Sequence, residues 1–156
     1  MNYHFLMPST QQTIEVERTE IKKARCPDIL MSSAMYITTS IGFYDPRTQS
    51  AYMLQDYYQP KYPELKRLDE RIDGIIRQDY QKLSGLNVIV AGDSWSKDYY
   101  GQLSFLSSNR RSIEIILRRY FAGNQITYLW APPSNMSRLF LDTSTGKHKL
   151  ELSSLL

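Results

Sequence analysis

Alternating apolar and polar side chains mark the first predicted strand. Residues 13–21, TIEVERTEI, alternate with a period of two, which is typical of a strand with one face in solvent. We therefore expect an edge or outer strand here. The next segment, DILMSSAMYITTSIGFY at residues 28–44, carries too few charges for a solvated surface. It predicts one long bent strand or two consecutive buried strands.

A β-hairpin is predicted at residues 37–55, ITTSIGFYDPRTQSAYMLQ. Its arms are rich in β-branched and aromatic residues, which suit a half-buried pleated sheet. The turn falls at residues 45–48, because Pro46 presets φ for the second position of a type I turn and the Asp45 carboxylate can accept a backbone hydrogen bond. The functional question is whether this hairpin is scaffold or the remains of an active site.

Apolar residues three and four positions apart predict an amphipathic helix over residues 64–83. The segment PKYP at residues 60–63 starts this helix, and the Ser-Gly pair at 84–85 ends it, since glycine is favoured just past a helix terminus. The apolar positions are Leu65, Leu68, Ile72, Ile75, Ile76 and Leu83. The following NVIVAG at residues 87–92 then predicts a short buried strand.

A second helix is predicted to begin near Ser107 or Ser108, whose hydroxyls can cap exposed backbone N–H groups, and to end at Gly123. Its expected buried residues are Ile113, Ile116, Leu117, Tyr120 and Phe121. Three strands follow, with a tight turn between the last two; their sequences are QITYLWAPP, RLFLD and KHKLEL. The whole order predicts a single mixed α/β domain over residues 1–156, with largely antiparallel sheets, two main helices and a loosely ordered segment at residues 1–12.

Composition narrows the class of protein. A chain of 156 residues with 42% hydrophobic side chains, 12 Tyr and 5 Phe is long enough to bury a core. No apolar run reaches the length of a membrane span, and the N-terminal residues lack the pattern of a signal peptide. We therefore expect a cytoplasmic protein without membrane insertion.

The charge balance gives little reason to expect a nucleic-acid partner. The net charge of +3 is the difference between 19 basic and 16 acidic residues, a small surplus. The strongest basic cluster lies on the second predicted helix, and we interpret it as a solvated helix face. Its members are Arg110, Arg111, Arg118 and Arg119.

Metal and disulfide chemistry are not expected. A single cysteine, Cys26, excludes an internal disulfide and a multi-cysteine zinc site. His4 and His148 lie at opposite ends of the chain, without carboxylates at ligand spacing. We predict no metal and no cofactor, and we interpret Cys26 as a buried or semi-exposed structural residue rather than a nucleophile.

Three stretches of the chain resemble the chemoreceptor glutamine deamidase family CheD. TTSIGFYDPRTQSAYML is similar to the family's strand, Asp-Pro turn and strand, and IVAGDSWSKDYYGQLSFLSSNRRSIEIILRRYFAGNQI to its Gly-Gly loop, helix and strand. SRLFLDTSTGKHKLEL resembles its closing strand, Thr-Gly turn and strand. The likeness covers roughly residues 27–152 as a pattern without a long identical run.

The resemblance implies that the reactive groups of the family are replaced. Family members use a Cys-His pair to hydrolyse the side-chain amide of glutamine in chemoreceptors, with the thiolate as nucleophile and the imidazole as proton carrier. Aligned without gaps on the Asp-Pro turn, Thr38 stands at the cysteine, Gln55 at the histidine and Ser32 at a supporting threonine. The Gly-Ser before the cysteine becomes residues 36–37, and the Gly-Gly loop becomes residues 92–93.

Neither replacement preserves the chemistry. A threonine hydroxyl is not ionised near neutral pH without a base, and a glutamine amide does not accept a proton in this range. We therefore expect the hairpin to be an inherited scaffold, in which Thr38 and Gln55 lie close together on neighbouring strands as a satisfied neutral pair.

Two polar and aromatic segments are candidate binding sites. Loops that follow buried strands often carry binding groups, and residues 92–102, GDSWSKDYYGQ, have this position. Residues 56–63, DYYQPKYP, form a second candidate. The alternative for both is a loop that packs over the sheet. The candidate residues are Asp93, Ser94, Trp95, Tyr99, Tyr100, Tyr57 and Tyr58.

The sequence thus leaves three functional hypotheses. The first is a CheD-like protein without deamidase activity that binds a chemoreceptor or another signalling protein in bacterial chemotaxis or a related system. The second is an active amide hydrolase with a rearranged site, in which Thr38 or Ser40 attacks. The third is a binder of acidic partners or nucleic acid through the paired arginines. The sequence does not name the partner or the pathway.

Overall fold

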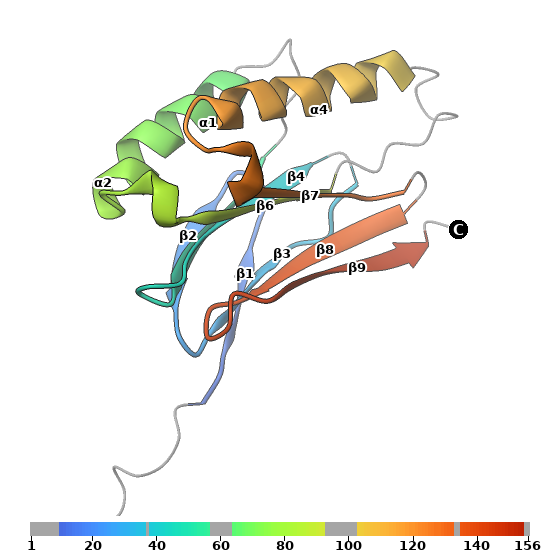
Figure 1. Cartoon of the computed structure of the whole chain (residues 1–156). Coiled ribbons are helices and arrows are strands. Elements are labelled where there is room, and N and C mark those ends of the chain that lie inside the picture. Colours follow the sequence, from blue (N-terminus) through green and yellow to red (C-terminus); the bar gives the residue numbers. More distant parts are fainter. Residues whose placement is uncertain (1–9, 37, 57–63, 93–102, 133–134, 155–156) are drawn as a thin grey trace, which may run out of the picture.

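The computed structural model describes residues 10–36, 38–56, 64–92, 103–132 and 135–154. Figure 1 shows three layers, with the helices on one face of a five-stranded sheet and a four-stranded sheet on its other face. The predicted fold class, a mixed α/β domain with two main helical segments, is confirmed. Within the described residues, every helix is too short or too polar to cross a bilayer.

The four-stranded sheet has the order β1-β3-β8-β9, with β1 parallel to β3 and the other pairs antiparallel. Its strands are β1 (Thr13–Val16), β3 (Ile29–Ser32), β8 (Asn135–Asp142) and β9 (His148–Ser154). The predicted edge position of the first strand is confirmed, but its predicted length is wrong. The chain turns after Val16, where the Glu17 N–H donates to the Glu20 carboxylate at 2.9 Å and Thr19 has a φ of 72°.

The five-stranded sheet has the order β2-β5-β4-β6-β7. Its strands are β2 (Ile21–Arg25), β5 (Ser50–Asp56), β4 (Thr39–Asp45), β6 (Asn87–Gly92) and β7 (Ile126–Trp130). The predicted β4–β5 hairpin is confirmed, and Asp45 accepts hydrogen bonds from the Arg47 N–H and the Thr48 hydroxyl. Of the two alternatives for residues 28–44, the structure has two strands, which lie in different sheets.

The first helical segment ends earlier than its apolar spacing predicts. It comprises α1 (Glu64–Arg71), the π-helical turn η2 (Ile72–Ile76) and α2 (Arg77–Asp79), and the 3₁₀ turn η3 covers Leu83–Gly85. Tyr80 is extended, with φ −103° and ψ 98°, and its hydroxyl lies 2.7 Å from that of Ser50 on β5. This tertiary contact takes the chain out of the helix before Leu83.

The second helix, α4 (Leu103–Arg118), begins before the predicted capping serines and ends before Gly123, which opens the 3₁₀ turn η4 (Gly123–Gln125). Of its predicted core residues, Ile113, Ile116 and Leu117 are buried. Phe121 is also buried, just past the helix end, whereas Tyr120 is half-buried. The prediction is therefore correct for the buried face and wrong for both ends.

Two hydrophobic cores hold the layers together, because β4, β5 and β6 are buried on both faces. Alternate residues of these strands, such as Phe43 and Leu54, pack against the helices, while their neighbours, such as Tyr44 and Met53, pack against the four-stranded sheet. This alternation follows from the two-residue period of a strand. It sends the odd-numbered side chains of β5, including that of Gln55, into the space between the sheets.

Candidate functional site

The residues at the family's catalytic positions meet between the two sheets. Thr38 directly precedes β4, and Gln55 lies near the end of β5, which pairs with β4 in antiparallel register. The Gln55 Nε2 donates to the Thr38 Oγ1 at 3.1 Å. Thr38 is 5% exposed and Gln55 is 1% exposed, so this contact is shielded from water. The predicted proximity of the two residues is confirmed, while the family assignment itself stays a prediction.

A second hydroxyl fixes the orientation of the Gln55 amide. The Ser33 Oγ donates to the Gln55 Oε1 at 3.0 Å. With its oxygen accepting from Ser33 and its nitrogen donating to Thr38, the amide has both ends engaged and presents an N–H, not a lone pair, to the threonine. The arrangement therefore holds the Thr38 hydroxyl in place without offering it a base.

Ser32, the position of the family's supporting threonine, has a different partner. Its buried Oγ accepts a hydrogen bond from the Leu139 N–H on β8 at 2.9 Å. Ser32 therefore ties β3 to β8, and the neighbouring Ser33 contacts the glutamine. The comparison with the family's pattern did not identify Ser33. The sequence alone does not determine which of the two neighbouring serines, Ser32 or Ser33, faces Gln55.

Two further buried hydroxyls lie on β4, with Thr39 on the helix side of the sheet and Ser40 on the side of Thr38 and Gln55. The Thr39 Oγ1 and the Ser40 Oγ have no hydrogen-bond partner among the described residues, and both residues are fully buried. A nucleophilic hydroxyl needs an adjacent base that removes its proton. Neither residue has such a contact within the described part of the chain, so their geometry is that of buried structural side chains.

Gly92 forms one wall of this site at the end of β6. Its φ is +112°, and a Cβ at this position would lie 2.6 Å from the Thr38 carbonyl oxygen and 3.1 Å from the Met35 sulfur. Only glycine fits both the backbone conformation and the close approach. The end of β6 therefore lies in close contact with the backbone of Thr38.

The predicted binding candidates lie outside the described residues. Asp93, Ser94, Trp95, Tyr99 and Tyr100 belong to residues 93–102, and Tyr57 and Tyr58 to residues 57–63. The attachment points of both segments are described. Asp56 and Gly92 are both paired with Thr39 in the sheet register, so the two candidate segments join the sheet on either side of the Thr38 site.

Cys26 is remote from this site. It directly follows β2, and its N–H donates to the Gln49 carbonyl at 2.8 Å, at the turn end of the hairpin. Gln55 lies at the opposite end of β5, so the thiol does not reach Thr38 or Gln55. Cys26 is exposed, and the expectation of a buried or semi-exposed cysteine is wrong, because the residue sits in a surface turn with its sulfur 3.3 Å from the Ser144 hydroxyl.

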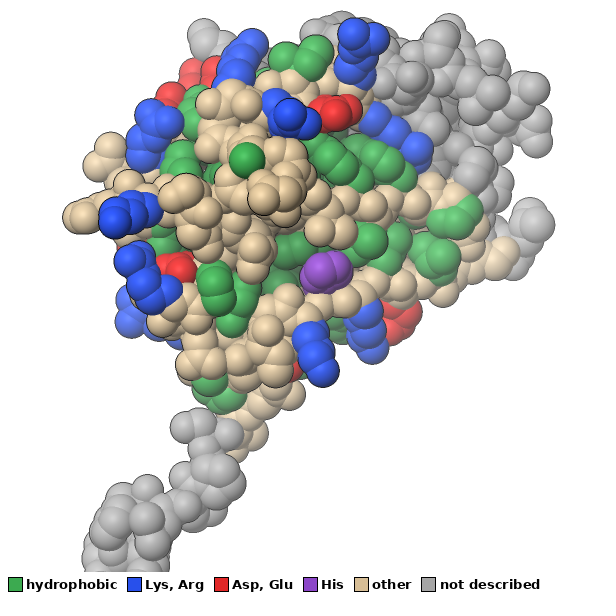
Figure 2. Space-filling view, in the orientation of Figure 1, with side chains coloured by type: hydrophobic (Ala, Val, Ile, Leu, Met, Phe, Trp, Pro, Cys, Tyr) green, Lys and Arg blue, Asp and Glu red, His purple; other side chains and the backbone are tan. Residues whose placement is uncertain are grey.

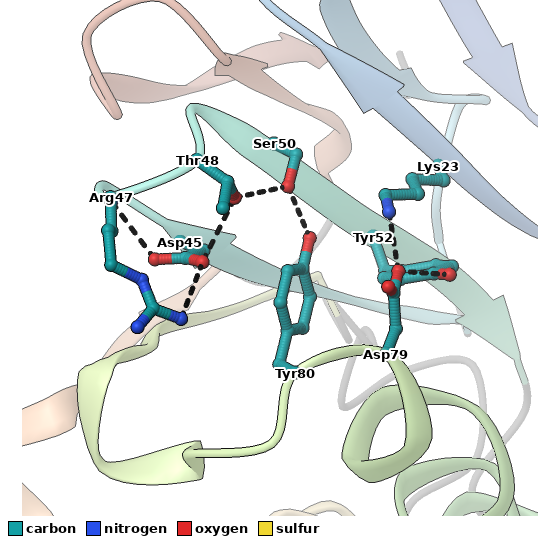
Figure 3. A network of polar contacts seen from close by, with 8 residues as sticks. All are labelled: Lys23, Asp45, Arg47, Thr48, Ser50, Tyr52, Asp79 and Tyr80. Atoms are coloured by element: carbon teal, nitrogen blue, oxygen red, sulfur yellow. Dashed lines mark hydrogen bonds and ion pairs between the residues drawn. The ribbon is translucent and has the colours of Figure 1, made fainter.

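A polar pocket that the sequence did not predict lies at the turn end of the hairpin. Its volume is about 290 Å³, and Lys23, Arg25, Arg47, Asp45 and Asp79 contribute its charged lining. Figure 3 shows a chain of hydrogen-bonded hydroxyl groups that starts at the Asp45 carboxylate. It continues through Thr48 and Ser50 to the phenol of Tyr80. This chain ties the hairpin turn to the end of α2.

Asp79 lies in the other part of this pocket and contacts two side chains from different strands. The Lys23 Nζ lies 2.5 Å from its carboxylate, and the Tyr52 hydroxyl donates to the same oxygen at 2.8 Å (Figure 3). The hydrogen bond from Lys23 lowers the pKa of Asp79. Burial, together with the bond to Asp79, raises the pKa of Tyr52. The residues come from separate elements, so their spacing in the sequence gave no signal.

The four arginines of the predicted basic cluster have different surroundings. Arg110 lies with its guanidinium 4.8 Å from the centre of the Trp130 ring, and Arg119 forms an ion pair with Asp69 at 3.5 Å. The other two members of the cluster, Arg111 and Arg118, are exposed. Figure 2 shows basic side chains scattered over the visible face rather than gathered in one patch.

No metal centre is evident in the part of the chain that the structure describes, where no three His, Cys, Asp or Glu side chains converge as possible ligands. Of the charged groups that line the pocket, Lys23 pairs with Asp79 and Arg47 with Asp45.

Comparison with known proteins gives only a distant likeness. No family model matches this chain, and no curated protein matches it in sequence. Among solved structures, the chain is similar to a hypothetical protein, YfiH, from Bacillus licheniformis, with a TM-score of 0.45 and 13% sequence identity. The match covers 67% of this chain and 47% of the YfiH chain, less than half of its length.

Proposed function

We propose that this chain is a CheD-like domain that has lost glutamine deamidase activity and acts by binding another protein. The hydrogen bond between Thr38 and Gln55 is the observation that carries the proposal. Amide hydrolysis by this family's chemistry needs a nucleophile and a group that takes up its proton. A hydroxyl held by an amide N–H at those two positions supplies neither.

The surroundings of Thr38 support the same proposal. The Gln55 amide is engaged at both ends, and the pair is almost completely shielded from solvent. Burial of a hydrogen-bonded neutral pair has a small free-energy cost, whereas burial of a pair that forms ions has a large desolvation cost. The alternative of an active hydrolase that uses Thr38 or Ser40 has less support, since neither hydroxyl contacts a basic side chain among the described residues.

The place where the candidate binding segments join the sheet supports a binding role. Both segments leave from residues paired with Thr39, so a partner that contacts them would cover the former catalytic position. We infer a partner of the kind that the resemblance implies, a chemoreceptor helix or another signalling protein in bacterial chemotaxis or a related system. Such a role belongs in the cytoplasm.

A purified cytoplasmic helical fragment of a chemoreceptor, with its glutamines intact, tests both halves of the proposal. After incubation with the protein, mass spectrometry should find no conversion of glutamine to glutamate. The fragment should nevertheless bind, as measured by a titration with the labelled fragment. Glutamate formation would refute the loss of activity, and a fragment that fails to bind would contradict the partner class.

Variants of the candidate loop locate the binding surface. Trp95→Ala and Tyr99→Ala should each weaken binding of the receptor fragment, because aromatic anchors dominate many protein interfaces. The matched control is Ile115→Ala, which removes a hydrophobic side chain that is 51% exposed on α4. Equal binding by all three variants would place the interface elsewhere.

A further inference from the structure

The last strand, β9, presents an open backbone edge. Among the described strands it pairs with β8 alone, at the edge of the four-stranded sheet (Figure 1). The Asp142 N–H donates to the Lys147 carbonyl at 2.9 Å, which marks this pair as hydrogen-bonded. Because bonded and non-bonded pairs alternate in an antiparallel ladder, the N–H and C=O groups of His148, Leu150 and Leu152 point away from β8. An open edge of this kind is a template for another strand.

The side chains of β9 alternate in charge as well as in direction. Lys149 and Glu151 lie on the outer face of the sheet, 3.8 Å apart and 69% and 59% exposed. Leu150 and Leu152 are on the opposite face, and Leu152 is 45% exposed. The central sequence Lys149-Leu150-Glu151 therefore has a positive charge at one end and a negative charge at the other. In a strand that runs the opposite way, the order of the two charges is reversed.

We propose that two copies of this chain associate through β9, as an antiparallel strand pair with its two-fold axis at Leu150. In this register Leu150 faces the partner's Leu150, and their outward backbone groups hydrogen-bond to each other. Lys149 then lies opposite the partner's Glu151 in a non-hydrogen-bonded pair, where cross-strand side chains are closest. Each Leu152 is covered by the partner's His148.

The charges select this register over its neighbours. Outward backbone groups recur at every second residue, so the register changes in steps of two residues and the axis moves in steps of one. An axis at Lys149 places Lys149 opposite the partner's Lys149, and an axis at Glu151 places Glu151 opposite the partner's Glu151, so both put like charges opposite each other. An axis at His148 places Lys147 opposite the partner's Lys149, and like charges directly opposite destabilise a strand pair. An axis at Leu152 places Glu151 opposite the partner's Ser153 and leaves both charged residues without an opposite charge. Only the axis at Leu150 pairs every Lys149 with a Glu151.

Charge complementarity makes a second copy the occupant that fits this edge. A strand with the reverse charge order is needed to pair with Lys149 and Glu151, and β9 itself provides it when it runs antiparallel. Exposed lysines can also protect a sheet edge from pairing, and in that case the protein would remain a monomer. The inference rests on the edge of β9 and does not depend on the proposed function.

Sedimentation of the whole chain over a range of concentrations tests the proposal. The wild type should show a reversible dimer, and Lys149→Glu and Glu151→Lys should each weaken the dimer by about tenfold or more, since each change turns two attractive cross-strand pairs into repulsive ones. The control is Arg111→Glu, a charge reversal at an exposed residue of α4 that should leave dimerisation unchanged. Far-UV circular dichroism confirms that each variant is folded.

An equimolar mixture of the two β9 variants provides the decisive arm. A chain with Glu at 149 and 151 and a chain with Lys at both positions are complementary in the proposed register. The mixture should therefore form heterodimers at least as well as the wild type forms dimers, although each variant alone does not. A wild type that is monomeric at every concentration would overturn the proposal, as would variants that dimerise like the wild type or a mixture that associates no better than its components.

Discussion

The hydrogen bond between Thr38 and Gln55 should make a measurable contribution to stability, and a double-mutant cycle isolates it. Thr38→Val replaces the hydroxyl by a methyl group of similar size. Gln55→Leu removes the amide and keeps most of the side-chain volume. The double variant removes both polar groups together, so the difference between its effect and the sum of the single effects reports the coupling of the two residues.

The expected magnitude follows from burial. Thr38→Val leaves the Gln55 Nε2 unpaired in a residue that is 1% exposed, and an unpaired buried polar group costs about 1–3 kcal/mol. Gln55→Leu leaves the buried Thr38 hydroxyl unpaired and also removes the partner of Ser33. We therefore expect each single variant to lose about 1–3 kcal/mol and the coupling energy to be about 1 kcal/mol.

Thr39→Val is the matched control. It is the same substitution at the adjacent residue, but its Oγ1 has no hydrogen-bond partner among the described residues. Removal of an unpaired buried hydroxyl should be neutral or slightly stabilising. Urea unfolding near neutral pH, followed by far-UV circular dichroism, measures all four variants and the wild type. Equal effects of Thr38→Val and Thr39→Val, together with additive effects in the cycle, would refute the reasoning.

Three further variants test contacts in other parts of the fold and at Gly92. Tyr128 has a buried hydroxyl without a hydrogen-bond partner among the described residues, and burial raises its pKa to about 12. Because this folded-state pKa lies above the ordinary value of about 10, stability should fall as pH rises from about 10 to 12, and Tyr128→Phe should lose less stability than the wild type over that range. The pKa of Asp79 is lowered chiefly by Lys23, so its contribution is present above about pH 4 and is lost as pH falls; the gap in urea midpoint between the wild type and Asp79→Asn should shrink at low pH. Gly92→Ala should destabilise by at least about 2 kcal/mol in urea unfolding, because its Cβ would clash with the Thr38 carbonyl at a positive φ, and a neutral result would contradict that geometry.

Local chemistry was sufficient to predict the hairpin. The Asp45 carboxylate and Pro46 define the turn, and the flanking β-branched and aromatic residues define the two arms, so β4 and β5 follow from the sequence. The end of α2 could not be found in this way. Leu83 continues the helical spacing, but the contact between Tyr80 and Ser50 joins residues thirty positions apart, and a local pattern contains no information about it.

The same distinction between local sequence signals and tertiary contacts applies to the candidate site. The proximity of Thr38 and Gln55 was predictable, because the hairpin brings the start of β4 beside the end of β5. The exact register was not, since Gln55 lies opposite Ser40 and reaches Thr38 diagonally. The role of Ser33, which directly follows β3, depends on how the four-stranded sheet packs against β5, and the Lys23–Asp79 pair joins residues fifty-six positions apart. Neither has a sequence signature. The aromatic candidates in the two attached segments stay predictions.

The most direct test of the proposed CheD-like site is to introduce the CheD family's reactive pair at positions 38 and 55. Cys26→Ser removes the exposed thiol, and two variants in that background, Thr38→Cys alone and Thr38→Cys with Gln55→His, each contain one cysteine. Both should fold, with slightly lower stability than the wild type. Their rates of alkylation by iodoacetamide near neutral pH compare the same buried thiol with and without a neighbouring imidazole. Our account predicts an alkylation rate about tenfold higher with the histidine, because an adjacent imidazole lowers the thiol pKa, and equal rates in the two variants would contradict it.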